Sequence, residues 1–307
     1  MAGKKIKTSE KNIKNPFKII ILISIVIIST FILFLALSDS FEITEPYESL
    51  TVTQIIDNYF VDHTTVVTND SMFLVNFTSR DIARLQQNLP VPVDGMKIGL
   101  RAEHSELFEL LRPNPGTVVV YPLFTSAAYD EPGFYTYFAG NCDERCITDL
   151  SFENPSVEFT SSGMTTQILH LLGYEFVTDI DVDRNPKILE KYDTVILLHN
   201  EYVTKKMFDA ITSHPNLIFL FPNALYAEID VNYKDNTMTL IRGHNYPEQS
   251  IANGFDYEIE ERFHDYEYDI ECFNWEFIEI ENGYHLNCYP DGMIQTDLNI
   301  LLKMKEL

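Results

Sequence analysis

The stretch that decides the fold is LEKYDTVILLHNEYVTKKMFDAITSHPNLIFLFPNALYAEIDV, residues 189–231. It contains two short apolar runs, residues 194–198 and 217–221, which are rich in β-branched or aromatic residues and hardly alternate. Such runs are typical of strands buried on both faces of a parallel sheet. Residues 203–214 lie between them and have the length of one helix. The sequence therefore predicts a right-handed strand, helix, strand unit, with the polar residues that follow both strands on the same edge of the sheet.

Strand and helix signals also alternate before this unit. We expect strands at 117–122 and 174–178, a helix at 165–172 and a short helix opening at Asn185-Pro186. Residues 124–146 are aromatic without a helical period, which indicates a long loop. Beyond residue 221 the pattern favours hairpins at 226–242 and 276–288, and a helix at 298–307. The predicted fold class is α/β: a doubly wound, mostly parallel sheet with an antiparallel C-terminal appendage, preceded by one transmembrane helix.

The transmembrane helix is expected at residues 19–37, an uncharged run that would be about 28 Å long as a helix. Six Lys and one Glu in residues 1–18 predict a cytoplasmic N-terminus and place the bulk of the chain outside the cell membrane. A cleaved signal peptide is the alternative. The expected organisation is a cytoplasmic tail (1–18), the membrane helix (19–37), a stalk (38–49), an N-terminal layer of unknown role (50–116), the α/β domain (117–255) and an acidic appendage (256–307).

Composition narrows the functional classes. The net charge of −24 over 307 residues disfavours a nucleic-acid partner. All four cysteines, Cys142, Cys146, Cys272 and Cys288, follow the apolar run, which favours two disulfides in an oxidising compartment. The pairs Cys142–Cys146 and Cys272–Cys288 close the shortest loops, but four cysteines allow three connectivities. Free thiols and a zinc site are the alternatives.

A family resemblance extends over roughly residues 165–231, and its quoted motifs begin at Thr178. The segments TDIDVD, KYD, HNEY, MFDA and PNALY occur in the order and spacing found in the C-terminal domain of the N,N-dimethylformamidase large (beta) subunit. The resemblance implies a fold similar to class I glutamine amidotransferases. It also implies amide hydrolysis at a mononuclear iron held by tyrosines and a carboxylate. The matching tyrosines are Tyr202 and Tyr226, and phenolate oxygen suits ferric iron. The carboxylate is not placed by the pattern, and Glu228 and Glu248 are the candidates.

Other side chains at the expected strand ends offer acid–base chemistry. His199 and Glu201 alternate after the first strand and could act as a general acid and base, and Asn223 follows the second strand. Hydrogen bonding that caps the edge of the sheet is the alternative. Asp179, Asp181 and Asp183 alternate as in a calcium loop, but the glycine and the terminal glutamate of an EF-hand are missing.

The chain departs from the family where the backbone should approach a ligand. Phe221-Pro222 stands in place of a glycine pair, and Val203 and Ala227 replace aromatic residues. These substitutions favour a surface binding or structural domain that has kept the fold and lost the chemistry. The alternative is an iron-dependent amide hydrolase. No small-molecule or cell-surface partner is identified by the sequence.

Overall fold

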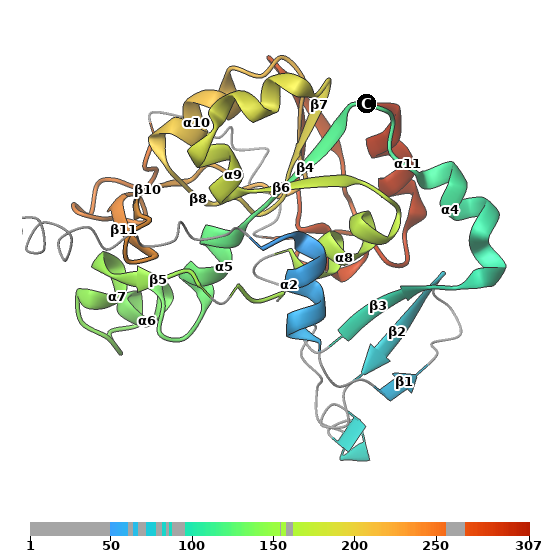
Figure 1. Cartoon of the computed structure of the whole chain (residues 1–307), viewed down its shortest axis with the longest axis horizontal. Helices are drawn as coiled ribbons and strands as arrows, with labels where there is room; N and C mark the ends of the chain where they lie inside the picture. Colours follow the sequence, from blue (N-terminus) through green and yellow to red (C-terminus); the bar gives the residue numbers. More distant parts are fainter. Residues whose placement is uncertain are drawn as a thin grey trace, which may run out of the picture. The chain divides into compact units, whose positions relative to one another are not determined.

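A six-stranded mixed sheet forms the centre of the protein (Figure 1). The computed structural model describes residues 50–60, 64–66, 72–77, 82–83, 86–87, 96–153, 155–157, 162–255 and 268–307. The strand order is β12 (Phe277–Ile280), β13 (Gly283–Leu286), β9 (Leu217–Phe219), β7 (Thr194–Leu197), β4 (Thr117–Tyr121) and β6 (Glu175–Thr178). The last five strands run parallel, and β12 pairs antiparallel with β13 at one edge.

Both faces of this central sheet are buried, as the lack of alternation predicts. Val118 and Val120 pack into one hydrophobic cluster, and Val119 between them packs into the other. Ile196 and Ile218 likewise lie on the Val119 side. Because successive side chains of a strand point to opposite faces, a continuous apolar run is what a sheet covered on both sides requires.

Helices cover the two faces of the central sheet. The Val118 side packs against α2 (Val52–Tyr59), α5 (Leu123–Tyr129), α6 (Phe134–Phe138), α9 (Asp179–Arg184), the 3-10 helix η4 (Pro186–Lys191) and α10 (Lys205–Thr212). The Val119 side packs against α4 (Ser105–Leu111), α8 (Gly163–Leu171) and α11 (Leu298–Glu306). Two short 3-10 helices, η2 (Ala102–His104) and η6 (Pro290–Gly292), precede α4 and α11.

A second sheet has the order β5 (Leu150–Ser151), β11 (Thr237–Arg242), β10 (Ala227–Asn232) and β8 (Tyr202–Val203). β10 and β11 form an antiparallel hairpin, and β8 pairs with β10 in parallel. The helix α7 (Arg145–Thr148) contacts β11 (Figure 1). Residues 198–201 lead directly from β7 to β8, so one short stretch of chain joins the central sheet to the second sheet.

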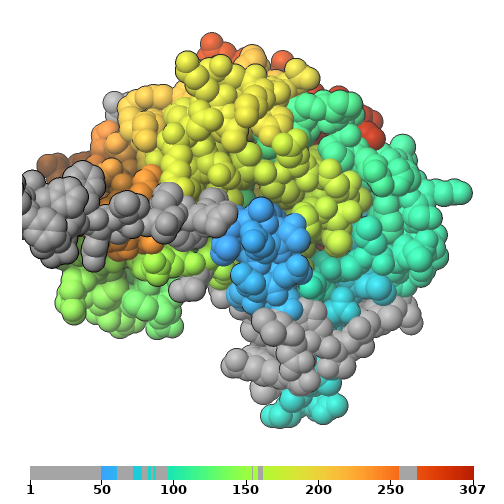
Figure 2. Space-filling model, in the orientation of Figure 1, coloured from blue at the N-terminus to red at the C-terminus, as the bar shows by residue number. Residues whose placement is uncertain are grey.

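A third sheet is antiparallel and consists of β1 (Thr64–Val66), β2 (Phe73–Phe77) and β3 (Met96–Leu100). The side chain of Gln167 in α8 accepts a hydrogen bond from the Ile98 amide at 2.9 Å and donates one to the Met96 carbonyl at 3.1 Å. These two bonds tie β3 to α8. The helix α2 lies on the surface in Figure 2, where its inner face contacts α8 and β6.

The predicted fold class is wrong as it stands. The structure is a mixed α/β arrangement of three sheets, not one doubly wound sheet with an appendage. The C-terminal hairpin belongs to the central sheet, because β13 pairs in parallel with β9. The hairpin of β10 and β11 builds a separate sheet with β8 and β5. Strand periodicity shows that a strand forms but does not select its neighbour, and this accounts for the error.

The predicted transmembrane helix, residues 19–37, lies outside the described residues, as do the rest of residues 1–49. In the part of the chain that the structure describes, every helix is too short or too polar to cross a bilayer.

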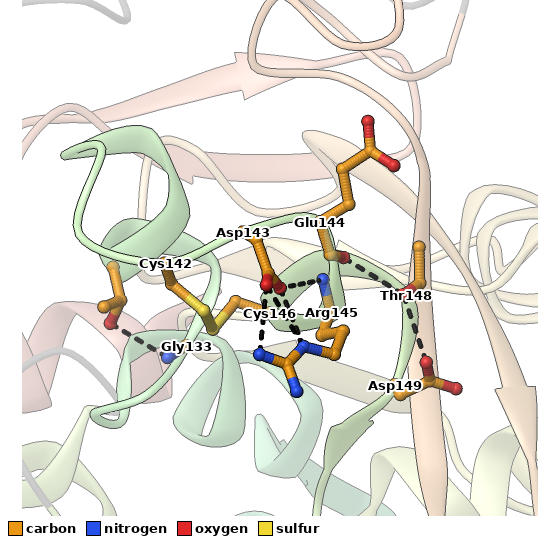
Figure 3. The surroundings of a disulfide bond; sticks show 9 residues. Gly133, Cys142, Asp143, Glu144, Arg145, Cys146, Thr148 and Asp149 are labelled. Carbon is orange, nitrogen blue, oxygen red and sulfur yellow. Dashed lines mark hydrogen bonds and ion pairs between the residues drawn. A yellow bond between two sulfur atoms is a disulfide. The ribbon is translucent and has the colours of Figure 1, made fainter.

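Residues 124–146 are not the long loop that we expected. They contain α5, α6 and the start of α7. Phe124 and Phe134 are buried, and Tyr129 and Tyr135 reach the site described below, so the usual helical alternation of apolar and polar residues is lost. The two short-loop disulfides are confirmed: Cys142 pairs with Cys146 (Figure 3), and Cys272 pairs with Cys288.

Candidate functional site

The carboxylate of Glu201 is the centre of a buried polar cluster. Its Oε1 lies 2.5 Å from Nε2 of His244 and accepts a hydrogen bond from the Tyr135 hydroxyl at 3.3 Å. Its Oε2 accepts a hydrogen bond from the Tyr129 hydroxyl at 2.8 Å and lies 3.3 Å from Nε2 of His199. The Glu201 side chain is fully buried, and a buried charge of this kind is stable only with several partners.

The turn between β7 and β8 places Glu201. The side chain of Asn200 accepts a hydrogen bond from the Leu198 amide at 3.0 Å and donates one to Asp179 at 2.7 Å. After the turn, the Tyr202 amide donates to Thr125 Oγ1 at 3.2 Å, and the Ala227 amide donates to the Glu201 carbonyl at 2.9 Å. The backbone of the turn is therefore held by α9, α5 and β10 together.

His199 and His244 keep the carboxylate of Glu201 ionised. Burial alone would raise its pKa, but the hydrogen bonds and charges of His199 and His244 outweigh burial and lower the pKa to about 2. The same charge, together with burial as the larger cause, raises the pKa of the Tyr129 and Tyr135 hydroxyls well above 10. At neutral pH the cluster therefore combines an ionised carboxylate with neutral phenols.

His244 was missed by the sequence analysis. It lies two residues after β11, and its backbone has φ = 52°, a left-handed conformation that non-glycine residues rarely adopt. Its neighbour Gly243 packs so closely on β10 that a Cβ there would lie 2.9 Å from Ala227 Cβ. Strained backbone of this kind often occurs where a functional side chain is held in place. The only sequence signal was a lone histidine after a hairpin strand.

Tyr202 and Tyr226 are brought together, but not by two strands of the central sheet. Tyr202 begins β8, and Tyr226 directly precedes β10, which pairs with β8 through Ala227 and Tyr202. The ring of His244 contacts both, with centroid distances of 5.5 Å to Tyr202 and 4.7 Å to Tyr226. The sequence predicted that two strands of one parallel sheet would bring these tyrosines to the same edge. The parallel pair of β8 and β10, in the second sheet, brings them together instead.

The implied iron can be compared with these residues. The Tyr202 hydroxyl is buried and has the Tyr135 hydroxyl as a hydrogen-bond neighbour. Burial and the charge of Glu201 raise its pKa well above 10, so a bound cation would be needed to hold it as a phenolate. The two predicted ligands, Tyr202 and Tyr226, both contact the ring of His244. Glu201 is less suited as the third, since both its oxygens already have partners.

The remaining predicted residues are spread around this cluster. His199 stacks on Phe221, with ring centroids 5.4 Å apart. Asn223 lies in the turn after β9, and its Oδ1 is buried without a hydrogen-bond partner among the described residues. Glu228 is half-buried in β10, and Glu248 is exposed.

The alternating aspartates face three separate sets of partners. Asp179 accepts hydrogen bonds from Asn200 and the Phe124 amide, Asp181 accepts from Thr178, and Asp183 accepts from Thr204 and Tyr233. Within the described ranges, no group of three or more His, Cys, Asp or Glu side chains is arranged to hold a metal ion.

A cavity of about 580 Å³ opens onto the cluster. Tyr135 and His244 belong both to the cluster and to the cavity wall, and α6, Glu144 just before α7 and the loop after β11 supply the remaining lining residues. This volume suits a small organic molecule. Glu201 itself is buried, but Tyr135 and His244, which both contact its carboxylate, line the cavity.

Comparison with known proteins identifies the family. No curated protein matches the chain. The model of the family described as N,N-dimethylformamidase beta subunit-like, C-terminal, matches residues 100–262, more than half of the 307 residues, and the match includes α5, α6, β7, β8 and the His244 loop. The chain that builds this cluster therefore belongs to the N,N-dimethylformamidase beta subunit-like, C-terminal family.

Proposed function

We propose that the chain hydrolyses small amides in the cavity beside Glu201, with His244 as the general base. The main observation in support is the distance of 2.5 Å between Glu201 Oε1 and His244 Nε2, because His244 lies in the wall of the cavity. The family to which the chain belongs is described by an amidase, which supports the reaction class.

The proposed mechanism follows from the pairing of His244 with Glu201. When Nε2–H donates to the carboxylate, Nδ1 of the neutral imidazole is left as the proton acceptor. It can then take a proton from the water that attacks the amide carbon and return it to the leaving amine. Glu201 orients the ring and stabilises the imidazolium that forms, because its charge is buried and already ionised.

The test is hydrolysis of N,N-dimethylformamide and a panel of small N-alkyl amides by the purified full-length chain. His244→Gln should lower kcat by about 10²–10⁴-fold, the usual contribution of a general base, while circular dichroism stays unchanged. His104→Gln is the matched control, because His104 lies before α4 and not in the cavity wall. Full activity of His244→Gln would exclude this mechanism.

A binding or structural role without catalysis is the alternative function. It is favoured by Phe221-Pro222, which stands where the family has a glycine pair, and by Val203 and Ala227, which replace aromatic residues. The same experiment separates the two. If the wild type turns over no amide in the panel yet binds small ligands in the cavity, the binding role replaces the hydrolase.

An iron-dependent version of the hydrolase is a second candidate, supported by the pairing of β8 with β10, which brings Tyr202 beside Tyr226. Tyr202 and Tyr226 would hold the ion, which when bound would polarise the amide carbonyl. Elemental analysis of protein purified without chelators should then find near-stoichiometric iron and a visible tyrosinate-to-iron band. Tyr202→Phe should remove both signals. Metal-free, colourless wild-type protein would leave the reaction to His244 and Glu201.

A further inference from the structure

The cavity beside His244 has aromatic walls. Tyr135, Tyr137, Phe138 and Tyr246 line it together with His244. Phe138 packs on His244 with ring centroids 5.8 Å apart, on Tyr135 at 6.0 Å and on Tyr137 at 5.6 Å. Phe138 is nevertheless 38% exposed, so part of this apolar ring remains open for a ligand to cover.

The charge of the cavity wall is negative. Glu144 lines the cavity, and none of its described lining residues is Lys or Arg. Arg145, the next residue, does not neutralise Glu144, because its guanidinium is bound to Asp143 at 2.9 Å and it lines a different cavity. Figure 3 shows the Glu144 side chain directed away from the Asp143–Arg145 pair.

Aromatic ring faces beside a carboxylate form a site that suits an alkylated ammonium ion. The face of an aromatic ring is electron-rich and attracts alkylated ammonium ions, which have a low cost of desolvation. A carboxylate ligand would instead face Glu144 without a compensating cation, which is unfavourable. On this chemistry, a cation would be favoured over an anion in the cavity.

We propose that this cavity binds ligands that carry an alkylated ammonium group, with Phe138 and its aromatic neighbours around the cation and Glu144 as the counter-charge. This inference rests on the proposed function, because it takes the cavity to be the substrate site. The substrates would then be small amides with a cationic N-alkyl group.

The test compares three probes of similar shape on the full-length chain by ligand-observed NMR titration. These are choline, its uncharged carbon isostere 3,3-dimethylbutan-1-ol, and the anion 3,3-dimethylbutanoate. Choline should bind at least about three-fold more tightly than the alcohol, as a cation–π contact at a partly exposed site predicts, and the anion should bind most weakly. Equal affinity of choline and the alcohol would overturn the proposal.

Two variants locate the binding. Phe138→Leu and Glu144→Gln should each weaken choline binding by about 2–5-fold and leave the alcohol nearly unaffected. Glu190→Gln removes the same charge from an exposed position on η4 that does not line the cavity, and it should change nothing. Choline binding that resists both cavity variants would place the cation elsewhere and refute the proposal.

The cation site and the proposed hydrolase activity can be refuted separately. Selective choline binding without hydrolysis of any amide would refute the proposed function and keep the cation site. Hydrolysis of neutral amides, with no preference for cationic ones and no selective choline binding, would refute the cation site alone.

Discussion

Glu201 and Asp179 are both fully buried carboxylates, yet their pKa values move in opposite directions. They are close neighbours in the fold: Asp179 follows β6, Glu201 follows β7, and Asn200 between them donates a hydrogen bond to Asp179. The pKa of Glu201 is lowered to about 2, whereas burial raises that of Asp179 to about 8.

The difference lies in the partners and not in the depth of burial. Asp179 accepts hydrogen bonds only from neutral amides, the Phe124 backbone and the Asn200 side chain, and these offset burial only in part. Glu201 has two histidines that can carry positive charge. Asp179, whose pKa burial raises, holds α5 and the β7 turn together. Glu201, whose pKa the histidines lower, can orient a histidine for chemistry.

The largest effect that would test this comparison is expected for Glu201→Ala. The substitution leaves two histidines and two tyrosine hydroxyls without their acceptor, and breaking a buried charge cluster costs about 3–5 kcal/mol. Urea denaturation should show this loss in the free energy of unfolding. Glu201→Gln keeps the volume and one acceptor oxygen and should lose less. Equal stability of the alanine variant and the wild type would mean that the cluster contributes nothing to the fold.

Asp179→Ala should have a smaller effect, because its partners are neutral. The amide of Phe124 and the side chain of Asn200 would remain as buried donors without an acceptor, at a cost of about 2–3 kcal/mol. The same denaturation series measures it. A loss larger than that of Glu201→Ala would reverse the ranking of charged over neutral partners.

The pH dependence of stability should separate the two carboxylates. Asp179 has a folded pKa of about 8 against an ordinary value of 3.8, so its contribution is fully present below pH 3.8 and is lost as the pH rises through 8. The slope is at most about 1.4 kcal/mol per pH unit. Glu201 behaves oppositely, because its contribution is present above pH 4.5 and is lost as the pH falls through about 2.

Denaturation at several pH values measures both slopes. The decline between pH 5 and pH 8 should be absent in Asp179→Asn, and the acid decline should be weaker in Glu201→Gln. Identical pH profiles of the wild type and Asp179→Asn would show that Asp179 is ionised in the folded protein.

The smallest effect is expected for Tyr135→Phe. The Tyr135 hydroxyl is 3.3 Å from Glu201 Oε1 and 2.9 Å from the Tyr129 hydroxyl, and the residue is only half-buried. Its removal should cost about 1 kcal/mol of unfolding free energy, and the ring that lines the cavity stays in place. Tyr137→Phe is the control in the same helix. Destabilisation by Tyr135→Phe as large as that of Glu201→Ala would make the phenols, not the histidines, the main partners of Glu201.

Several features followed from the sequence because they depend on residues close together in the chain. The apolar runs at 194–198 and 217–221 contain the parallel strands β7 and β9, and Asn282-Gly283 joins β12 to β13. The two disulfides were the short-loop pairs. The HNEY motif placed Glu201 and Tyr202 directly after a strand, and the family expected from it is the family found. Local periodicity, turn residues and loop length carry this information.

The tertiary structure alone decided which strands pair and which side chains meet. No pattern showed that β13 would join the central sheet while β10 and β11 would build another around β8. The pairing of β8 with β10 brings Tyr202 beside Tyr226, and the left-handed turn after β11 brings His244 onto Glu201, 43 positions earlier in the chain. Hydrogen bonding between strand edges is the same for every sequence, so the choice of neighbour depends on packing across the whole molecule. For that reason Glu201 and its near neighbour His199 were visible in the sequence, whereas the distant partners His244, Tyr129 and Tyr135 were not.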